Sequence, residues 1–192
     1  MKNYRLGDIA DVKFCVISPG RMKKQVTPTL WLSCSNFSEG NVLLGNPTEA
    51  YYSPELEMKI SPGDIVIKRI SPTYVNFINE IGTDLYAGNN LIIVTANGNI
   101  YPKYLAAVLN EKMPAFSTET SIGAVMKSIS RPDLEAMTVP VHSYKTQISI
   151  GNLWFDNIEC KKMKMKLAVL EYTKTNYEIK HFVSLSGGKK DD

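Results

Sequence analysis

The chain has 192 residues, of which 44% are apolar, and it carries a formal net charge of +3. This length suits one folded domain with a substantial core and an extension. There is no run of about 18 apolar residues, which excludes a hydrophobic membrane span, and the charged opening residues lack the apolar stretch of a signal peptide. Three widely spaced cysteines, Cys15, Cys34 and Cys160, are typical of free thiols in a reducing compartment. We therefore expect a cytoplasmic protein without a membrane anchor.

The first third of the chain contains short elements separated by turns. Residues 4–12 are expected to form a turn and a short helix, and residues 30–35 alternate between apolar and small side chains like a half-buried strand. The Ser61-Pro62-Gly63-Asp64 sequence is a turn signal, and the apolar run Ile65-Val66-Ile67 follows it at once. We expect this run to be a short buried strand.

The middle of the chain adds strands and a helix to the same domain. Residues 74–81 alternate and are expected to pair with the preceding strand, and residues 91–94 form a second buried run. Residues 102–110 begin with a proline and carry apolar side chains at helical spacing, which predicts a helix. Residues 131–140 are expected to give one helical turn and a last strand. Mixed elements without a βαβ alternation predict an α+β head.

Residues 144–183 contain no proline and a single glycine, Gly151, which predicts one long helix. The expected pairing side chains are Trp154, Ile158, Met165, Tyr172 and Ile179, and the last four recur every seven residues. An apolar stripe of this kind needs a cover, which is either a partner helix or the head of the same chain. We expect residues 1–143 to form the head, residues 144–183 a dimerisation and spacer helix, and residues 184–192 a disordered tail.

Cationic and hydrogen-bonding side chains collect in the predicted loops of the head. A DNA-binding protein needs cations for phosphates and planar polar groups for base edges. The candidates are Arg21, Lys23, Lys24, Lys68, Arg69, Ser71, Tyr74, Asn89, Asn90, Thr118, Thr120, Ser121, Lys127 and Ser128. Two alternatives stay open. Asn89-Asn90 also has the sequence of a turn. Lys68-Arg69 also has the position of charges that flank an apolar strand.

Patterns for catalysis are weak in this sequence. Asn46-Pro47-Thr48 is not the Asp/Asn-Pro-Pro-aromatic motif of an adenine methyltransferase, and there is no glycine-rich cofactor loop. Glu57 and Lys59 have the Glu-x-Lys spacing of metal-dependent nucleases, but no aspartate precedes them closely enough to share a cation. His142 and His181 have no serine or cysteine arranged beside them. We expect no catalytic residue, no metal and no cofactor.

Several segments nevertheless occur in a recognisable order. They are the opening LGDIADV, the turn and strand PGDIVIKR, the helix YPKYLAAVLN, the segment GAVMKSISRPDLEAMTVPV, and Gln147 seven residues after Pro140. In this order they resemble the DNA specificity subunit of type I restriction-modification systems, over residues 4–183. The junction before the long helix departs from the family pattern, because His142 and Ser143 replace prolines, and Lys145 and Thr146 stand where glutamates are common.

The resemblance implies a single target recognition domain followed by one conserved helix. A complete specificity subunit carries two such domains joined by two helices, reads a split site in double-stranded DNA, and binds methyltransferase subunits without catalysis of its own. One head and one helix therefore imply a half-subunit, and a homodimer formed through the C-terminal helix would read an interrupted palindrome. Methyltransferase and translocase or endonuclease subunits are the implied protein partners. The alternatives are an assembly module with the same fold that does not read DNA, and a nuclease.

Overall fold

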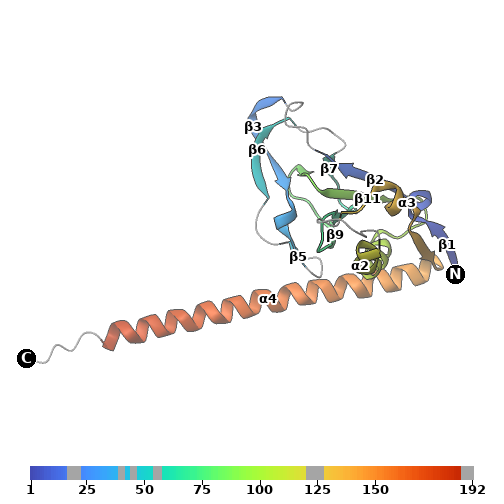
Figure 1. The fold of residues 1–192 in the computed structure, drawn as a ribbon. Coiled ribbons are helices and arrows are strands. Elements are labelled where there is room, and N and C mark those ends of the chain that lie inside the picture. Colours follow the sequence, from blue (N-terminus) through green and yellow to red (C-terminus); the bar gives the residue numbers. More distant parts are fainter. Residues whose placement is uncertain (17–22, 39–41, 44–46, 54–57, 120–127, 187–192) are drawn as a thin grey trace, which may run out of the picture. The chain divides into compact units, whose positions relative to one another are not determined.

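The computed structural model describes residues 1–16, 23–38, 42–43, 47–53, 58–119 and 128–186. The chain divides into two units, which we call the head (Met1–Phe155) and the C-terminal unit (Asp156–Asp192). Within the described ranges, no helix combines the length and the apolar character needed to cross a membrane. The mixed α+β head followed by a long helix confirms the predicted fold class (Figure 1).

The central sheet of the head is antiparallel, with strand order β2-β11-β8-β9. Its strands are β2 (Ala10–Cys15), β11 (Leu91–Ala96), β8 (Ile65–Lys68) and β9 (Val75–Phe77). The predicted pairing of the segment after Tyr74 with the Ile65 strand is confirmed, because Ile65 lies opposite Phe77 and Ile67 opposite Val75. Both apolar runs singled out in the sequence, in β8 and β11, lie at the centre of this sheet.

The second sheet has the order β6-β3-β10-β7. It contains β6 (Thr48–Tyr52), β3 (Lys24–Leu32), β10 (Leu85–Ala87) and β7 (Lys59–Ile60), and β10 runs parallel to β3. The predicted strand at residues 30–35 ends at Leu32, because Ser33 and Asn36 form a capping box around a 3₁₀ turn, η1 (Cys34–Asn36). Gly88 follows β10 at a close approach, since a Cβ atom there would lie 2.6 Å from the Leu32 carbonyl oxygen.

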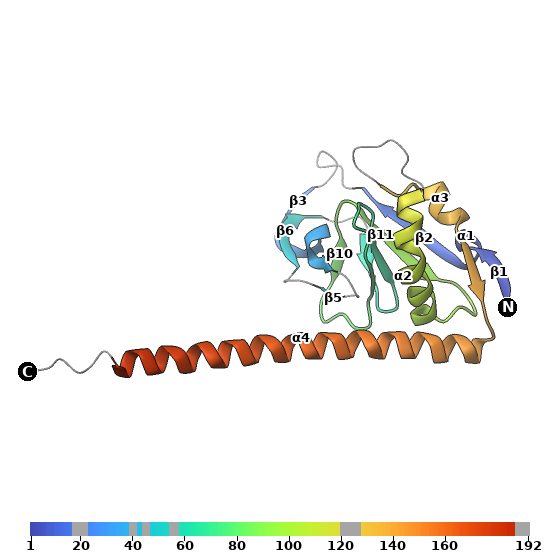
Figure 2. The same cartoon turned by 60° about the horizontal axis from the view of Figure 1, so that its bottom comes forward.

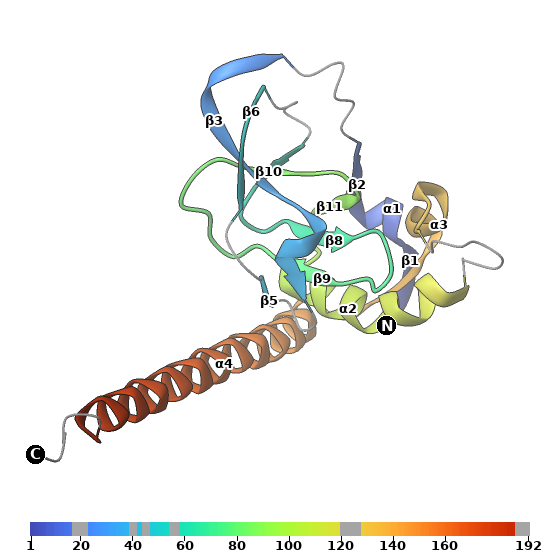
Figure 3. The same cartoon turned by 60° about the vertical axis from the view of Figure 1, so that its left-hand side comes forward.

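The central sheet is buried on both faces, which explains why β8 and β11 are continuously apolar. Ile65, Ile67, Ile92 and Val94 face a first core that includes side chains of α2 (Pro102–Glu119). Val66, Leu91 and Ile93 face a second core shared with the second sheet. Each fully buried aliphatic side chain of this kind contributes about 1.5–3 kcal/mol by removal from water. Figure 2 shows α2 in front of the central sheet, and Figure 3 shows the two sheets as separate layers.

A third pair of strands joins the two ends of the head sequence. β1 (Lys2–Arg5) runs antiparallel to β12 (Thr138–Val141), so that Lys2 lies opposite Val141. Two short helices, α1 (Leu6–Ile9) and α3 (Arg131–Ala136), pack on each other beside this pair. β4 (Phe37–Ser38) and β5 (Val42–Leu43) form a further small antiparallel pair.

The long helix α4 (Tyr144–Ser186) has 43 residues and begins where the sequence predicts it. At 1.5 Å per residue its length is about 64 Å. Its first turns, about three of them up to Phe155, belong to the head, and the remainder forms the C-terminal unit. The residues from Gly187 onward lie outside the described ranges.

Candidate nucleic-acid interface

Strand register brings distant parts of the sequence to one end of the central sheet. Leu91, at the start of β11, lies opposite Cys15 at the end of β2 and opposite Lys68 at the end of β8. The segments that follow β2 and β8 and the segment that precedes β11 therefore meet at this end. It carries Phe14, Lys68, Arg69, Tyr74, Asn90 and Arg131, and we call it the basic end of the sheet.

Lys68 and Tyr74, both expected from the sequence, are in contact across the connection between β8 and β9. The Lys68 amide donates to the Tyr74 carbonyl oxygen at 2.9 Å, and the Lys68 ammonium lies 5.3 Å from the centre of the Tyr74 ring. Both residues are half-buried, and a cation–π contact that water still reaches contributes about 0.5–1 kcal/mol. Ser71 is exposed in the turn between the two strands.

Arg69 and Asn90 are also brought together, through their backbones. The Arg69 amide donates to the Asn90 carbonyl oxygen at 2.8 Å. Asn89 and Asn90 form the turn into β11, with Asn90 at a φ of 63°, so the turn read from the sequence is present. Asparagine tolerates this left-handed conformation better than most residues because its short amide can bond locally.

The segment around Ser128 is tied to the same end. The Arg69 side chain donates through Nε to the Ile129 carbonyl oxygen at 2.8 Å, and the Ile129 amide donates to the Arg69 carbonyl oxygen at 3.3 Å. An isolated bridge pairs Ile70 with Ser128. The predicted residues Arg69 and Ser128 therefore lie close together although far apart in sequence.

Sequence reasoning did not place Phe14 at this end and did not include Arg131 among the DNA-binding residues. The guanidinium carbons of Arg69 and Arg131 each lie 5.5 Å from the centre of the Phe14 ring. A sequence signal existed for Arg131, which is an arginine next to a polar loop. No sequence pattern pointed to Phe14, because its role depends on the register of β2 in the sheet.

Cys34 closes the basic end on the side of the second sheet. Its sulfur donates weakly to the carbonyl oxygens of Asn89 and Asn90, both at 3.7 Å. Burial raises the pKa of the Cys34 thiol, and the nearby charge of Lys68 acts in the opposite direction. The thiol is therefore neutral at physiological pH and adds no charge to the cluster of cations.

The other predicted DNA-binding residues lie in other elements of the head or outside the described residues. Lys23 and Lys24 are exposed at the start of β3, in the second sheet. Thr118 belongs to the last turn of α2. Arg21, Thr120, Ser121 and Lys127 lie outside the described residues. The basic end therefore gathers only part of the predicted set.

Of the two residues of the nuclease alternative, Glu57 and Lys59, the structure describes Lys59. Glu57 lies outside the described residues, and the Lys59 ammonium lies 2.8 Å from the Asp84 carboxylate. In the part of the chain that the structure describes, no group of three His, Cys, Asp or Glu side chains is arranged to hold a metal ion. His142 packs edge-on to Tyr104, with ring centres 6.1 Å apart.

The junction before α4 includes Ser143, which departs from the family pattern, and Gln147, which follows it. Ser143 caps the helix, since its hydroxyl oxygen accepts from the Thr146 amide at 3.3 Å. Gln147 is only 2% exposed, and its side-chain oxygen accepts from the Tyr101 amide at 2.9 Å while its nitrogen donates to the His142 carbonyl oxygen at 3.0 Å. Ser143 therefore caps the start of α4 at the position where the family pattern has a proline.

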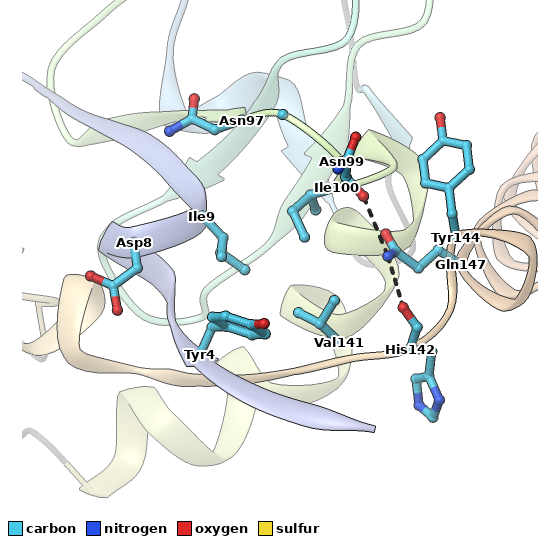
Figure 4. A pocket seen from close by; sticks show the side chains of 11 residues that line it. Tyr4, Asp8, Ile9, Asn97, Asn99, Ile100, Val141, His142, Tyr144 and Gln147 are labelled. Atoms are coloured by element: carbon cyan, nitrogen blue, oxygen red, sulfur yellow. Dashed lines mark hydrogen bonds between the residues drawn. The ribbon is translucent and has the colours of Figure 1, made fainter.

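A cavity of about 750 Å³ opens beside this junction, within the head. Figure 4 shows Ile9, Ile100 and Val141 on its inner side, with Tyr4, Asp8, His142 and Tyr144 around them. Gln147 forms part of the same wall through its hydrogen bonds to the His142 and Asn99 carbonyl oxygens. The lining combines the apolar side chains of Ile9, Ile100 and Val141 with polar ones, and Asp8 is the acidic residue among them.

The side chains expected to pair along α4 differ in exposure. Trp154 is half-buried and packs against the first core, and Ile158 is only 4% exposed. Met165, Tyr172 and Ile179 are 43%, 71% and 54% exposed, and lie in the C-terminal unit. Of the five side chains expected to pair, the exposed ones are therefore Met165, Tyr172 and Ile179.

No protein-family model and no curated protein matches the chain. Three solved structures share its fold, each over about nine-tenths of its length. They are a chain from a study of the assembly of a type I restriction-modification system (16% identity, TM-score 0.59), the HsdS subunit from Thermoanaerobacter tengcongensis (18%, 0.59), and the type I S subunit from M. genitalium (15%, 0.57).

The matches cover 93%, 87% and 90% of this chain but only 42%, 39% and 44% of the respective solved chains. The chain therefore spans about four-tenths of the length of the structures that it matches. It has the fold of a type I restriction-modification specificity subunit, in which mixed sheets are followed by a long helix, and this confirms the resemblance read from the sequence.

Proposed function

We propose that the chain is a DNA-binding specificity half-subunit of a type I restriction-modification system. The observation that carries the proposal is the basic end, where Lys68, Arg69 and Arg131 converge beside the aromatic rings of Phe14 and Tyr74 and the turn at Asn90. Its role is to bind one half of a bipartite site in double-stranded DNA. Catalysis, methyl donor and metal then belong to partner subunits.

The chemistry of the basic end suits a DNA duplex. Arginine and lysine side chains contact phosphates, which fix position, whereas asparagine, serine and arginine side chains can hydrogen-bond base edges. Among the described residues only Glu135 is ion-paired with an arginine of this end, at 3.8 Å from Arg131 and with both side chains well exposed. Such an exposed pair contributes at most about 1 kcal/mol and yields readily to a phosphate.

Pairing of two copies through α4 supplies the second half of the site. Taking 3.6 residues per turn, one face of the C-terminal unit carries a row of exposed apolar side chains. We call it the pairing stripe, and it consists of Met165, Val169, Tyr172, Ile179 and Val183. Two identical heads held by such a pair would read an interrupted palindrome, with the helices setting the distance between half-sites.

A second apolar row lies roughly on the opposite side of the same helix. We call it the opposite stripe, and it consists of Met163, Leu167, Leu170 and Tyr177. A helix with two exposed apolar faces suits a small bundle better than a simple pair. We propose that a methyltransferase subunit binds the opposite stripe. Translocase or endonuclease subunits would join the complex through that methyltransferase subunit.

The test is selection of duplexes from a random pool by the purified chain, alone and together with its methyltransferase partner. The proposal predicts enrichment of two short identical sequences in inverted orientation, separated by a constant spacer. Enrichment of a single uninterrupted motif would retain DNA reading but reject pairing. If no sequence is enriched under either condition, the proposed function is wrong.

A second candidate is an assembly module with this fold that does not read DNA. The two apolar faces of α4 and the mild net charge of +3 favour it. A variant with Lys68, Arg69, Lys127 and Arg131 all replaced by glutamine separates the two candidates. Loss of duplex binding with intact methyltransferase affinity supports DNA reading, whereas a wild-type chain that binds the methyltransferase but no duplex supports the assembly module.

A further inference from the structure

Two arginines of the head share one aromatic ring. Arg69 comes from the end of β8 and Arg131 from the start of α3, and each guanidinium carbon lies 5.5 Å from the centre of the Phe14 ring. Phe14 itself is half-buried and packs against the first core, so the ring is held by the fold. Two like charges are thereby brought to one place at the surface of the central sheet.

The positions of the two guanidinium groups are restricted in different ways. Arg69 Nε donates to the Ile129 carbonyl oxygen at 2.8 Å, which fixes the plane of that guanidinium group. Arg131 is exposed, and its ion pair with Glu135 has a distance of 3.8 Å. Arg69 makes no ion pair with another described residue. The two guanidinium groups and the Glu135 carboxylate together therefore carry a net positive charge.

Two cations close together repel each other unless an anion lies between or beside them. A guanidinium group matches phosphate oxygens through paired N–H donors, and an aromatic ring stacks with its face. Holding the side chain beforehand lowers the entropy lost on binding. The arrangement therefore has the charge, the donors and the preorganisation of a phosphate-binding site.

We propose that Phe14, Arg69 and Arg131 form a phosphate clamp for the DNA backbone, with Phe14 as the positioning residue and the two arginines as the contacts. The inference rests on the proposed function and deepens it. It separates the roles at the basic end: the clamp sets the position of the duplex independently of its sequence, while neighbouring side chains are left to read bases.

The test is the salt dependence of duplex binding by the full-length chain, measured by fluorescence anisotropy with one selected and one unrelated duplex. Arg131→Gln is the main variant because its side chain is exposed and its loss should not unfold the head. It is expected to weaken binding to both duplexes by the same factor, about 5–10-fold, and to lower the slope of log K against log salt by about 0.9. Arg131→Lys should retain the slope and lose part of the affinity.

Arg5→Gln is the matched control, since Arg5 is an exposed arginine on β1, in the two-stranded sheet. It should leave both the affinity and the slope close to those of the wild type. Phe14→Leu should weaken both duplexes about threefold while the midpoint of thermal unfolding shows the head still folded. Arg69→Gln should act as Arg131→Gln does, with some loss of stability from the lost bond to Ile129.

The outcomes distinguish the clamp from the function on which it rests. If the wild type binds duplexes and Arg131→Gln changes neither slope nor affinity more than Arg5→Gln, the clamp is wrong and the proposed function stands. If Arg131→Gln weakens only the selected duplex, Arg131 reads bases and the clamp is likewise wrong. If the wild type binds no duplex at any salt concentration, either alone or with its methyltransferase partner, both the clamp and the proposed function are wrong.

Discussion

Gln147 shows how one buried side chain can hold a junction together. Its amide accepts from the Tyr101 backbone before α2 and donates to the His142 backbone before α4. Replacing it with the isosteric methionine leaves these buried backbone groups without partners, which costs about 1–3 kcal/mol for each. We predict that Gln147→Met lowers the free energy of unfolding by at least about 2 kcal/mol in urea titrations.

The matched control is Gln25→Met, which removes the chain's other glutamine. Gln25 makes one exposed hydrogen bond to the Thr27 carbonyl oxygen, so its loss should cost less than about 0.5 kcal/mol. Equal losses in the two variants would show that Gln147 has no special structural role.

Cys15 predicts a pH dependence of stability. Burial raises the pKa of its thiol from the ordinary 9.0 to about 12, with the charge of Lys13 opposing. The stabilising contribution is complete below pH 9 and is lost between pH 9 and 12, because only the unfolded thiol ionises in that range. Between pH 8 and 10, the free energy of unfolding should fall by about 1.4 kcal/mol more in the wild type than in Cys15→Val.

Urea titrations at pH 8 and pH 10 measure this difference between the wild type and Cys15→Val. The same two titrations of Cys160→Val provide the control, since Cys160 is exposed. This variant should show the same fall as the wild type. A wild-type fall that equals that of Cys15→Val would mean that the Cys15 thiol ionises at similar pH in the folded and unfolded states.

At the scale of elements, the packing of α4 on α2 depends on the one glycine of the long helix. A Cβ atom at Gly151 would lie 2.5 Å from the Tyr104 backbone nitrogen and 2.9 Å from the Lys103 carbonyl carbon. Alanine favours a helix by about 1 kcal/mol over glycine, but a clash with backbone cannot be relieved by a rotamer change. We predict that Gly151→Ala lowers the free energy of unfolding by at least about 2 kcal/mol.

Ser149→Ala is the matched control, because Ser149 is exposed on the same turns of α4. It should be neutral or slightly stabilising in the same denaturant titration, since alanine has the higher helix propensity. A Gly151→Ala chain as stable as Ser149→Ala would contradict the close approach of the two helices.

The elements that sequence reasoning found are those with strong local patterns. β8 and β11 are apolar runs, and α4 lacks proline over its whole length, so their type could be predicted. Most of β3 escaped prediction because residues such as Lys24, Thr27 and Pro28 are polar or strand-breaking and lie exposed. Its pairing with β6 and β10, which no local pattern encodes, determines its structure.

The candidate site was predictable only in part, for the same physical reason. Lys68, Arg69 and Tyr74 are close in sequence and could be grouped directly. The addition of Phe14 and Arg131 depends on strand register and on the position of α3, which are long-range features of the fold. The cations were therefore identifiable as residue types, whereas their convergence on one ring was not.

At the scale of the molecule, the proposal depends on what α4 does beyond the head. The chain spans only about four-tenths of the specificity subunits that share its fold. In the proposed function, the exposed side chains of the pairing stripe and of the opposite stripe are the surfaces through which this chain joins a larger assembly. Tyr172 and Tyr177 allow the two surfaces to be tested separately, because both are 71% exposed and they lie about 140° apart around the helix.

We predict that Tyr172→Glu, in the pairing stripe, abolishes association of the chain with itself, because it places a charge in an apolar contact. Tyr177→Glu, in the opposite stripe, should leave this association intact and weaken binding of the methyltransferase subunit at least tenfold. Analytical ultracentrifugation of each variant, alone and with the methyltransferase, checks both statements. Equal effects of the two substitutions on self-association would contradict the division of α4 into two surfaces.

The central claim is that two copies form one specificity unit. The measurement that tests it most directly is the solution mass of the wild-type chain, determined by light scattering over a range of concentrations. The account predicts a stable dimer near twice 21.5 kDa. A monomer at every concentration would contradict it, and the expectation of an interrupted palindrome would fall with it.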